Sequence, residues 1–309
     1  MQSFRNFAIS FLTAFCITAL IFGTVAVIVV PKMASDITGS SDNSKKDQSD
    51  LVIGFEPATD ENVNTDDSTG FSVLLVGTDK RPTKSESEVD SLIFVKVCPA
   101  KKTVVFLPIP TNMRVTVDDS IVPLSSLRTL KNMDYLCEKV TGLIGTNINY
   151  YAIASLTSFK RIINDLGGVE YTVSEDMKFV DEADDLNIDI PKGNQIMDGE
   201  ASTEYLRYSS DGFGERMLRN VNFLKTIIRK YTNEQYRSQA GSLFAKVGEN
   251  ITTDFTETDL AQYIDIIYGY PSYDEKDIVF PGEYVKDDQG GTYFEANTSL
   301  AYELLAEYK

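Results

Sequence analysis

The chain has 309 residues, enough for one large domain or two smaller ones, and its hydrophobic fraction of 42% is ordinary for a globular protein. The net charge of −17 argues against non-specific nucleic-acid binding. Histidine is absent, which excludes Ser-His-Asp and Cys-His catalysis as well as histidine metal ligands. Cys16, Cys98 and Cys137 are widely spaced without a metal-binding pattern, so we expect buried free thiols.

Residues 7–30 contain no charged side chain. As a helix this segment is roughly 36 Å long, enough to cross a bilayer core of about 30 Å. Arg5 precedes it and an acidic chain follows Lys32, which favours a cytoplasmic tip at residues 1–6 and a body outside the membrane. A cleaved signal peptide is the alternative. Because the apolar run exceeds a usual signal core, we predict an uncleaved, single-pass transmembrane helix.

Residues 31–70 are polar, acidic and rich in Ser, Thr, Asp and Asn. Such a composition cannot bury enough apolar surface to fold, so it predicts a disordered tether that holds the folded part off the membrane. The folded body is expected to span residues 71–309 on the outer side of the cell membrane.

The folded body opens with three short apolar runs. Residues 71–76 are short enough for a buried strand. Residues 91–97 and 103–109 predict two further strands, which form a hairpin around the turn at residues 99–102.

Polar residues gather where these strands end. Asp79 and Arg81 lie just past the carboxyl end of the first strand, where open α/β sheets bind ligands. Asp90 immediately precedes the second strand, so the three side chains converge if both loops lie on one edge of the sheet. Two carboxylates and a guanidinium suit Mg²⁺ plus a phosphate, although a solvated surface salt bridge would give the same pattern.

The middle of the chain alternates between helix and strand. A helical pattern lies within residues 124–142, and residues 148–154 predict a strand. A helix at residues 155–166 is expected to stop at the glycine pair that follows it, before a strand at residues 169–173. Helix followed by strand is typical of a layered α/β sheet.

The second half of the chain is predicted to be mostly helical. Helices are expected at residues 199–208, 215–231, 235–247, 257–268 and 298–307. Between them we expect a loop or irregular hairpin at residues 179–192, a turn at residues 193–199 and a hairpin at residues 277–294. Asp198, Thr256 and Asn297 are placed to cap three of the helices.

Three motifs carry a resemblance to a known family. Residues 74–81 read Leu-Leu-Val-Gly-Thr-Asp-Lys-Arg, residues 164–170 read Asn-Asp-Leu-Gly-Gly-Val-Glu, and residues 191–224 hold a longer motif with several arginines. Their order behind an anchor and a tether resembles the LytR–CpsA–Psr (LCP) family of cell-envelope proteins, over about residues 73–230. The resemblance implies an α/β/α sandwich with a central mixed sheet and an apolar pocket. It also implies transfer of a glycopolymer from a polyprenyl-pyrophosphate carrier to peptidoglycan.

The resemblance also assigns roles to individual residues. It places Asp79 and Asp90 at a Mg²⁺ site and makes them, with Arg207, the catalytic residues. It assigns phosphate binding to four arginines: Arg81, Arg207, Arg216 and Arg219. Arg216 and Arg219 are three residues apart near a helix start, so we expect them to share a face.

The chain departs from the family pattern at four positions: Glu88, Thr111 and Ser209 stand where the family usually has arginine, and Asn112 where it has aspartate. Each charge-assisted phosphate contact contributes about 1.5–3 kcal/mol. Three lost arginines would therefore cost about 5–9 kcal/mol, or about 10³–10⁶ in affinity or rate. The alternative is thus a catalytically weakened LCP-fold protein that binds carrier lipid or an envelope partner without turnover. A carbohydrate-binding module is a third class, disfavoured because tryptophan is absent.

Overall fold

The structure is a computed structural model that describes residues 70–79, 88–165, 167–183, 185–208, 213–286 and 290–308. The predicted transmembrane helix, and all of the predicted tether except Gly70, lie outside the described residues. Within the described ranges, no helix is both long enough and apolar enough to cross a bilayer.

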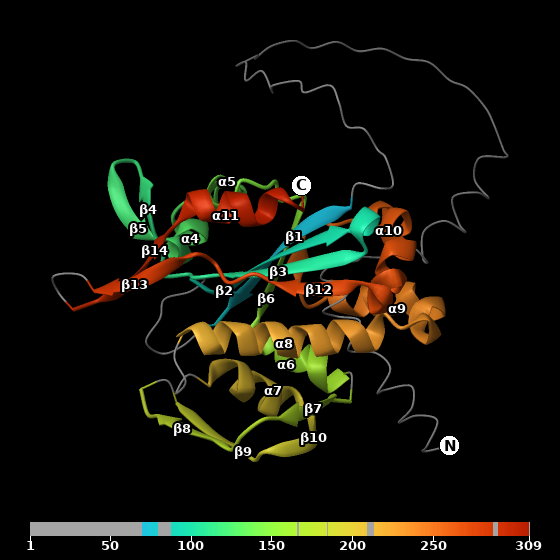
Figure 1. The fold of residues 1–309 in the computed structure, drawn as a ribbon. Helices are drawn as coiled ribbons and strands as arrows, with labels where there is room; N and C mark the ends of the chain where they lie inside the picture. Colours follow the sequence, from blue (N-terminus) through green and yellow to red (C-terminus); the bar gives the residue numbers. More distant parts are fainter. Residues whose placement is uncertain are drawn as a thin grey trace, which may run out of the picture.

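A six-stranded mixed sheet forms the centre of the molecule (Figure 1). In spatial order its strands are β11 (Thr252–Thr253), β6 (Tyr150–Ser155), β1 (Phe71–Thr78), β2 (Val89–Cys98), β3 (Thr103–Ile109) and β12 (Asp274–Asp277). Strand β1 pairs antiparallel with β2 and parallel with β6, and β3 pairs parallel with β12. The predicted first strand, the β2–β3 hairpin and the central mixed sheet are confirmed.

Both faces of this sheet are covered. On β1, Phe71, Val73 and Leu75 belong to the core on one face, and Leu74 and Val76 belong to the core on the other. Burial on both faces explains why the strands read as nearly continuous apolar runs, without the alternation of a half-exposed strand.

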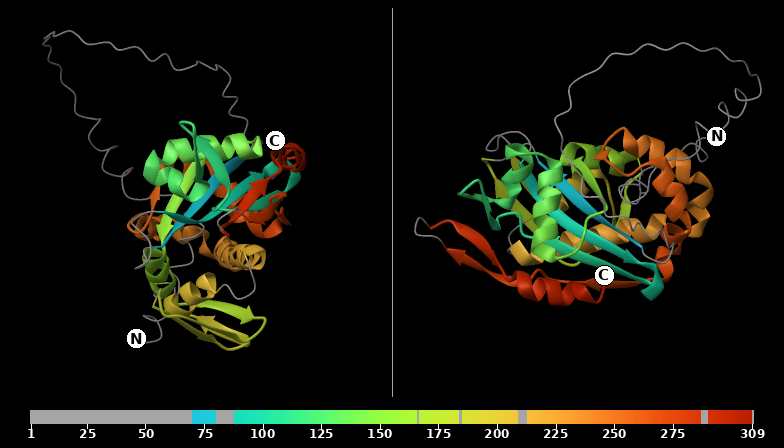
Figure 2. Two further views of the ribbon diagram at one scale, coloured as in Figure 1. Left: turned by 90° about the vertical axis from the view of Figure 1, so that its left-hand side faces the viewer. Right: turned by 90° about the horizontal axis from the view of Figure 1, so that it is seen from above.

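Helices form the two outer layers (Figure 2). One face carries α5 (Met133–Ile144), α11 (Thr298–Ala306) and the short α4 (Leu127–Leu130). The opposite face carries α6 (Leu156–Asp165) and α8 (Phe213–Tyr231), with α9 (Ala240–Gly248) and α10 (Glu257–Gly269) contributing to the same core. The expected α/β/α sandwich is therefore confirmed.

A fourth group of elements lies outside α6 and α8 (Figure 1). It consists of α7 (Gly199–Arg207) and two small sheets, which pair β7 (Val169–Val173) with β10 (Gly193–Met197) and β8 (Met177–Asp181) with β9 (Leu186–Ile190). The predicted strand β7 is present but lies outside the central sheet, and one expectation was wrong here: the segment predicted as a turn contains strand β10. Gly168, at a φ of +86°, redirects the chain after α6, and backbone pairing with β7 then makes a strand of a segment with little apolar alternation.

Two hairpins project from the same side of the molecule (Figure 1). The predicted hairpin near the C-terminus is confirmed as β13 (Gly282–Lys286) and β14 (Thr292–Ala296). A hairpin that the sequence did not predict joins β4 (Arg114–Val117) to β5 (Ser120–Pro123), and a bridge between Met113 and Phe294 links the two hairpins.

The predicted helix caps are present. Asp198 accepts a hydrogen bond from the Ala201 backbone N–H, Asn297 caps α11, and Thr256 with Asp259 forms a capping box at α10. Cys98 is a buried free thiol and Cys137 a half-buried one, whereas Cys16 lies outside the described residues.

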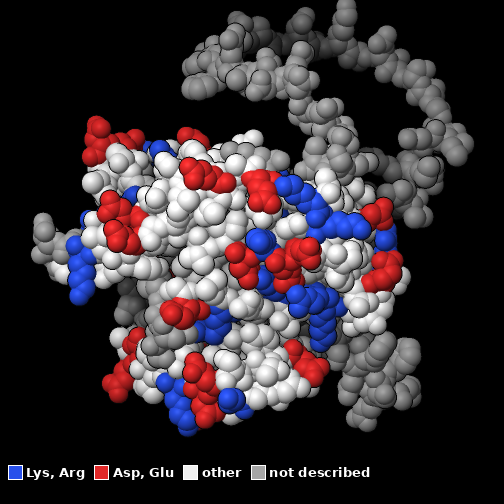
Figure 3. All heavy atoms as spheres, viewed as in Figure 1, with Lys and Arg blue, Asp and Glu red and all other residues white. Residues whose placement is uncertain are grey.

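Charged side chains gather over α8 and the edge strand β12 (Figure 3). Lys225 on α8 is buried, lies 3.7 Å from a Glu275 carboxylate oxygen and also pairs with Asp277. Arg229, one turn later, lies 2.6 Å from the other Glu275 oxygen, which also accepts a hydrogen bond from the Tyr270 hydroxyl. These contacts fix α8 against an edge strand that carries almost no apolar surface of its own.

Candidate functional site

A cavity of about 230 Å³ lies between the central sheet and α8, at the carboxyl end of β1. Its walls come from the sheet strands, from α6, α7 and α8, and from the β8–β9 hairpin. The apolar lining includes Leu75, Leu92, Ile93, Phe159, Phe179, Leu206, Met217, Phe223, Leu224 and Ile227. The structure therefore contains an apolar pocket of the kind that the family resemblance implied.

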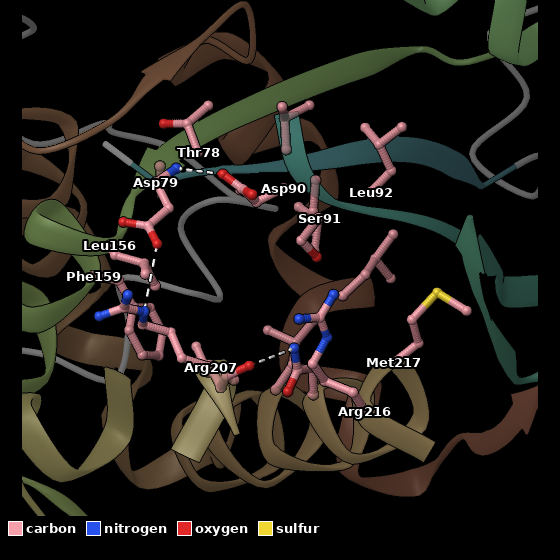
Figure 4. A pocket seen from close by; sticks show the side chains of 18 of the residues that line it. Thr78, Asp79, Asp90, Ser91, Leu92, Leu156, Phe159, Arg207, Arg216 and Met217 are labelled. Atoms are coloured by element: carbon pink, nitrogen blue, oxygen red, sulfur yellow. Dashed lines mark hydrogen bonds and ion pairs between the residues drawn. The ribbon is translucent and has the colours of Figure 1, made fainter. Parts of the chain in front are cut away.

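Three charged side chains meet at one end of the cavity (Figure 4). Asp79 directly follows β1, and its backbone N–H donates a hydrogen bond of 2.9 Å to Asp90 Oδ2 on β2. Arg207, the last residue of α7, places its Nε 3.5 Å from Asp79 Oδ2. The Asp79 and Arg207 side chains are only 11% and 21% exposed, so this ion pair is largely shielded from water.

Helix α8 supplies Arg216 to the same cavity. Figure 4 shows its side chain projecting from the helix toward Ser91 and Leu92 on β2. The residues of α8 that face the cavity are Arg216, Met217, Asn220, Phe223, Leu224 and Ile227, which recur at helical spacing. The stripe is polar near the start of the helix and apolar beyond Asn220.

Arg219 lies outside this stripe. Its guanidinium donates a hydrogen bond to the Tyr208 backbone carbonyl and lies over the rings of Tyr205 and Tyr208, at 5.6 and 5.2 Å from their centroids. Burial lowers the pKa of Arg219 from its ordinary value. Residues three apart differ by about 60° around a helix, and here that rotation places Arg216 in the cavity and Arg219 beside it. Of these two arginines, Arg216 therefore lines the cavity and Arg219 does not. Arg81 lies outside the described residues.

The positions that depart from the family pattern differ in whether they line the cavity. Thr111 lines the cavity. Asn112 turns away and donates a hydrogen bond of 3.1 Å to the Thr292 carbonyl, and the nearby Arg114 stacks on the Tyr293 ring at 3.8 Å. Ser209 lies outside the described residues. Arg114 therefore does not replace the guanidinium absent at Thr111.

The carboxylates can be tested for their fit to a metal ion. In the described part of the chain, no three acidic or cysteine side chains gather into a complete metal-binding cluster. Asp79 and Asp90 instead both line the cavity, where Asp90 Oδ2 accepts the Asp79 backbone N–H and Asp79 Oδ2 lies 3.5 Å from the Arg207 Nε. Mg²⁺ commonly binds through one or two carboxylates and completes its shell with water and substrate phosphates. This donor pair therefore fits Mg²⁺ held together with a phosphorylated ligand.

Among the polar residues of the cavity, Asn220 and Asp181 were not predicted from the sequence. Asn220 follows Arg216 by four residues, and its Nδ2 donates a hydrogen bond of 3.3 Å to the Leu206 carbonyl. Asp181 comes from β8. The helical spacing from Arg216 could have identified Asn220, but no pattern in the sequence connects Asp181 to the site.

Comparisons with known proteins agree with this architecture. Residues 27–309 match the profile of the LytR_cpsA_psr family. A protein of Bacillus licheniformis named polyisoprenyl-teichoic acid–peptidoglycan teichoic acid transferase TagU is 25% identical over 295 residues, which cover 93% of this chain and 90% of the relative. A protein of Bacillus subtilis named polyisoprenyl-teichoic acid–peptidoglycan teichoic acid transferase TagV is 26% identical over 211 residues, which cover 65% of this chain and 54% of the relative.

Solved structures share the fold. The crystal structure of Bacillus subtilis TagV aligns with a TM-score of 0.67 at 24% identity, over 78% of this chain and 97% of that structure. A structure described as TagT bound to LIIa-WTA aligns with a TM-score of 0.61 at 21% identity, over 84% of this chain and 93% of that structure. Because the family profile covers most of the sequence and the fold agrees, this chain belongs to the LytR–CpsA–Psr family.

Proposed function

We propose that the protein is a membrane-anchored, extracytoplasmic transferase that moves a glycopolymer from a polyprenyl-pyrophosphate carrier to peptidoglycan. One observation carries this proposal: an apolar cavity ends at two carboxylates and an arginine, Asp79, Asp90 and Arg207. A polyprenyl pyrophosphate matches this cavity, because its apolar chain fits the apolar lining and its anionic head fits the charged end. The names of the relatives, which are teichoic acid transferases, support the same class of reaction.

The reaction exchanges the phosphoanhydride bond of the carrier for a phosphate ester bond to peptidoglycan. A hydroxyl of peptidoglycan forms a bond to the glycan-linked phosphorus, the bridging P–O bond of the pyrophosphate breaks, and polyprenyl phosphate leaves. The hydroxyl proton passes to a base, and the cavity offers the carboxylates of Asp79, Asp90 and Asp181 for this role. This chemistry needs no histidine.

The positive side chains bind and orient the pyrophosphate. Arg207 and Arg216 line the cavity, and guanidinium groups form short, charge-assisted hydrogen bonds to phosphate oxygens. Asp79 holds the Arg207 side chain through the ion pair between them. Asp79 and Asp90 would hold Mg²⁺, which when bound offsets the negative charge of the pyrophosphate. Arg81 remains a predicted phosphate ligand.

The transfer reaction is tested by replacing Asp79. The full-length protein is incubated with a lipid-linked glycopolymer, Mg²⁺ and peptidoglycan, and the release of polyprenyl phosphate is measured. Asp79→Asn is expected to lower the rate by at least about tenfold, because a charged contact of about 1.5–3 kcal/mol is lost. Asp189→Asn makes the same change on an exposed strand and should leave the rate unchanged. A normal rate in Asp79→Asn would exclude the proposed role.

The proposed anchor has its own test. Residues 7–30 would hold the protein in the membrane, and residues 31–70 would connect this helix to the folded body outside the cell. We expect the protein to remain in the membrane pellet after an alkaline wash. Protease added outside the cell is expected to release the folded body by cutting within residues 31–70. Recovery of intact protein in the soluble fraction would contradict an uncleaved anchor.

A second candidate function rests on Thr111. The cavity presents a hydroxyl at this position, where the family pattern has arginine. A protein that binds the carrier lipid without turnover would therefore keep the cavity but would not catalyse the transfer of the glycopolymer. Binding of a polyprenyl pyrophosphate without any release of polyprenyl phosphate would favour this second function.

A further inference from the structure

The end of α7 is held by side chains of α8. The last carbonyl groups of a helix lack partners within the helix, and Tyr208, at φ −55° and ψ 130°, does not provide a left-handed cap. Instead, Asn220 donates its Nδ2–H to the Leu206 carbonyl at 3.3 Å, and the Arg219 guanidinium donates to the Tyr208 carbonyl. The backbone on both sides of Arg207 is thus tied to two consecutive residues of α8.

Arg219 is itself fixed in place. Its guanidinium lies over the rings of Tyr205 and Tyr208, and the Tyr205 hydroxyl donates a hydrogen bond of 3.0 Å to the Tyr171 hydroxyl. Arginine stays protonated even when burial lowers its pKa, so a positive charge is held at the carboxyl end of α7. This is the end of a helix at which a cation is stabilising.

From this geometry we infer that Arg219 is a positioning residue: it holds the end of α7 so that Arg207 faces Asp79 and the cavity. The family resemblance assigned Arg219 to the phosphates, whereas the structure directs its guanidinium to a backbone carbonyl. The inference rests on the proposed function insofar as Arg207 is taken to bind pyrophosphate. The position of the Arg207 Nε, 3.5 Å from Asp79 Oδ2, is the feature that Arg219 maintains.

A double-mutant cycle distinguishes positioning from direct binding. Binding of farnesyl pyrophosphate with Mg²⁺ is measured by calorimetry for the full-length parent, Arg219→Met, Arg207→Ala and the double variant. Arg219→Met is expected to weaken binding about tenfold in the parent and less than about twofold when Arg207 is already alanine. A residue that touches the phosphate independently would cause a similar loss in both backgrounds, and that result would overturn the inference.

Two further variants make the cycle specific. Lys230→Met removes one positive charge from an exposed side chain in the last turn of the same helix and should leave binding unchanged. If Lys230→Met and Arg219→Met weaken binding equally, the loss comes from the lower positive charge of α8 and not from the position of Arg207. That result would overturn the inference. If Arg219→Met does not fold, Arg219→Lys replaces it, because lysine keeps the buried cation without the planar guanidinium. The loss of binding caused by Arg219→Lys is again compared between the parent and Arg207→Ala.

A crystal structure of the Arg219 variant separates this inference from the proposed function. We expect the end of α7 to shift and Arg207 to leave its contact with Asp79. An unmoved Arg207 would overturn the positioning role, whatever the ligand. Failure of the parent to bind farnesyl pyrophosphate would count against the proposed function, and the crystal structure alone would then decide the positioning role.

Discussion

Lys225→Met is expected to lower the free energy of unfolding by about 3 kcal/mol. Lys225 is buried on α8 and interacts with Glu275 and Asp277 on β12, and its ammonium lies 5.1 Å from the centroid of the Phe106 ring. Removing it leaves Glu275, whose side chain is only 13% exposed, with less positive charge nearby. Arg229 remains paired with Glu275, which places the expected loss at the lower end of the range for a broken buried pair.

Urea unfolding measures this loss, and Lys178→Met is the matched control. Lys178 pairs with Asp189 at 3.2 Å, but both side chains are largely exposed, at 73% and 68%. An exposed pair contributes only about 0–1 kcal/mol, so the control should be nearly as stable as the parent. Similar losses in the two variants would show that burial of the α8–β12 network does not contribute to stability. A large loss in Lys225→Met alone would show that this buried network stabilises the packing of α8 against β12.

Thr111→Arg is expected to tighten the binding of farnesyl pyrophosphate about 10- to 100-fold, because one charge-assisted phosphate contact contributes about 1.5–3 kcal/mol. Thr111 is half-buried and lines the same cavity as Asp79 and Arg207, so a guanidinium placed here can approach the ligand's anionic end. The family resemblance also expects arginine at this position.

Calorimetry with Mg²⁺ measures the change, and Thr116→Arg is the control. Thr116 is an exposed residue of β4, so the control adds the same charge at a position that does not line the cavity. We expect no tightening in the control. If Thr111→Arg also fails to tighten binding while its melting temperature stays at the parent value, residue 111 does not face the anionic end of the ligand, and the missing arginine does not explain a weakened site.

The sequence determined the features that depend on neighbouring residues. Apolar runs identified β1, β2 and β3 because each strand is short and buried on both faces. Asp198 and Thr256 identified helix starts, since a cap acts over only three residues. The sequence predicted that Asp79 and Asp90 converge if both loops lie on one edge of the sheet, and the antiparallel pairing of β1 with β2 meets that condition.

The tertiary structure decided which distant residues meet. The sequence of β12 consists of four charged residues and shows no strand pattern, and its parallel pairing with β3 comes from backbone hydrogen bonds and the ion pairs to α8. The sequence likewise could not separate the roles of Arg216 and Arg219, because the orientation of α8 depends on how it packs against α7 and the sheet. Periodicity and capping act within a few residues, whereas the contact between Asp79 and Arg207 depends on the packing of elements that are far apart in the chain.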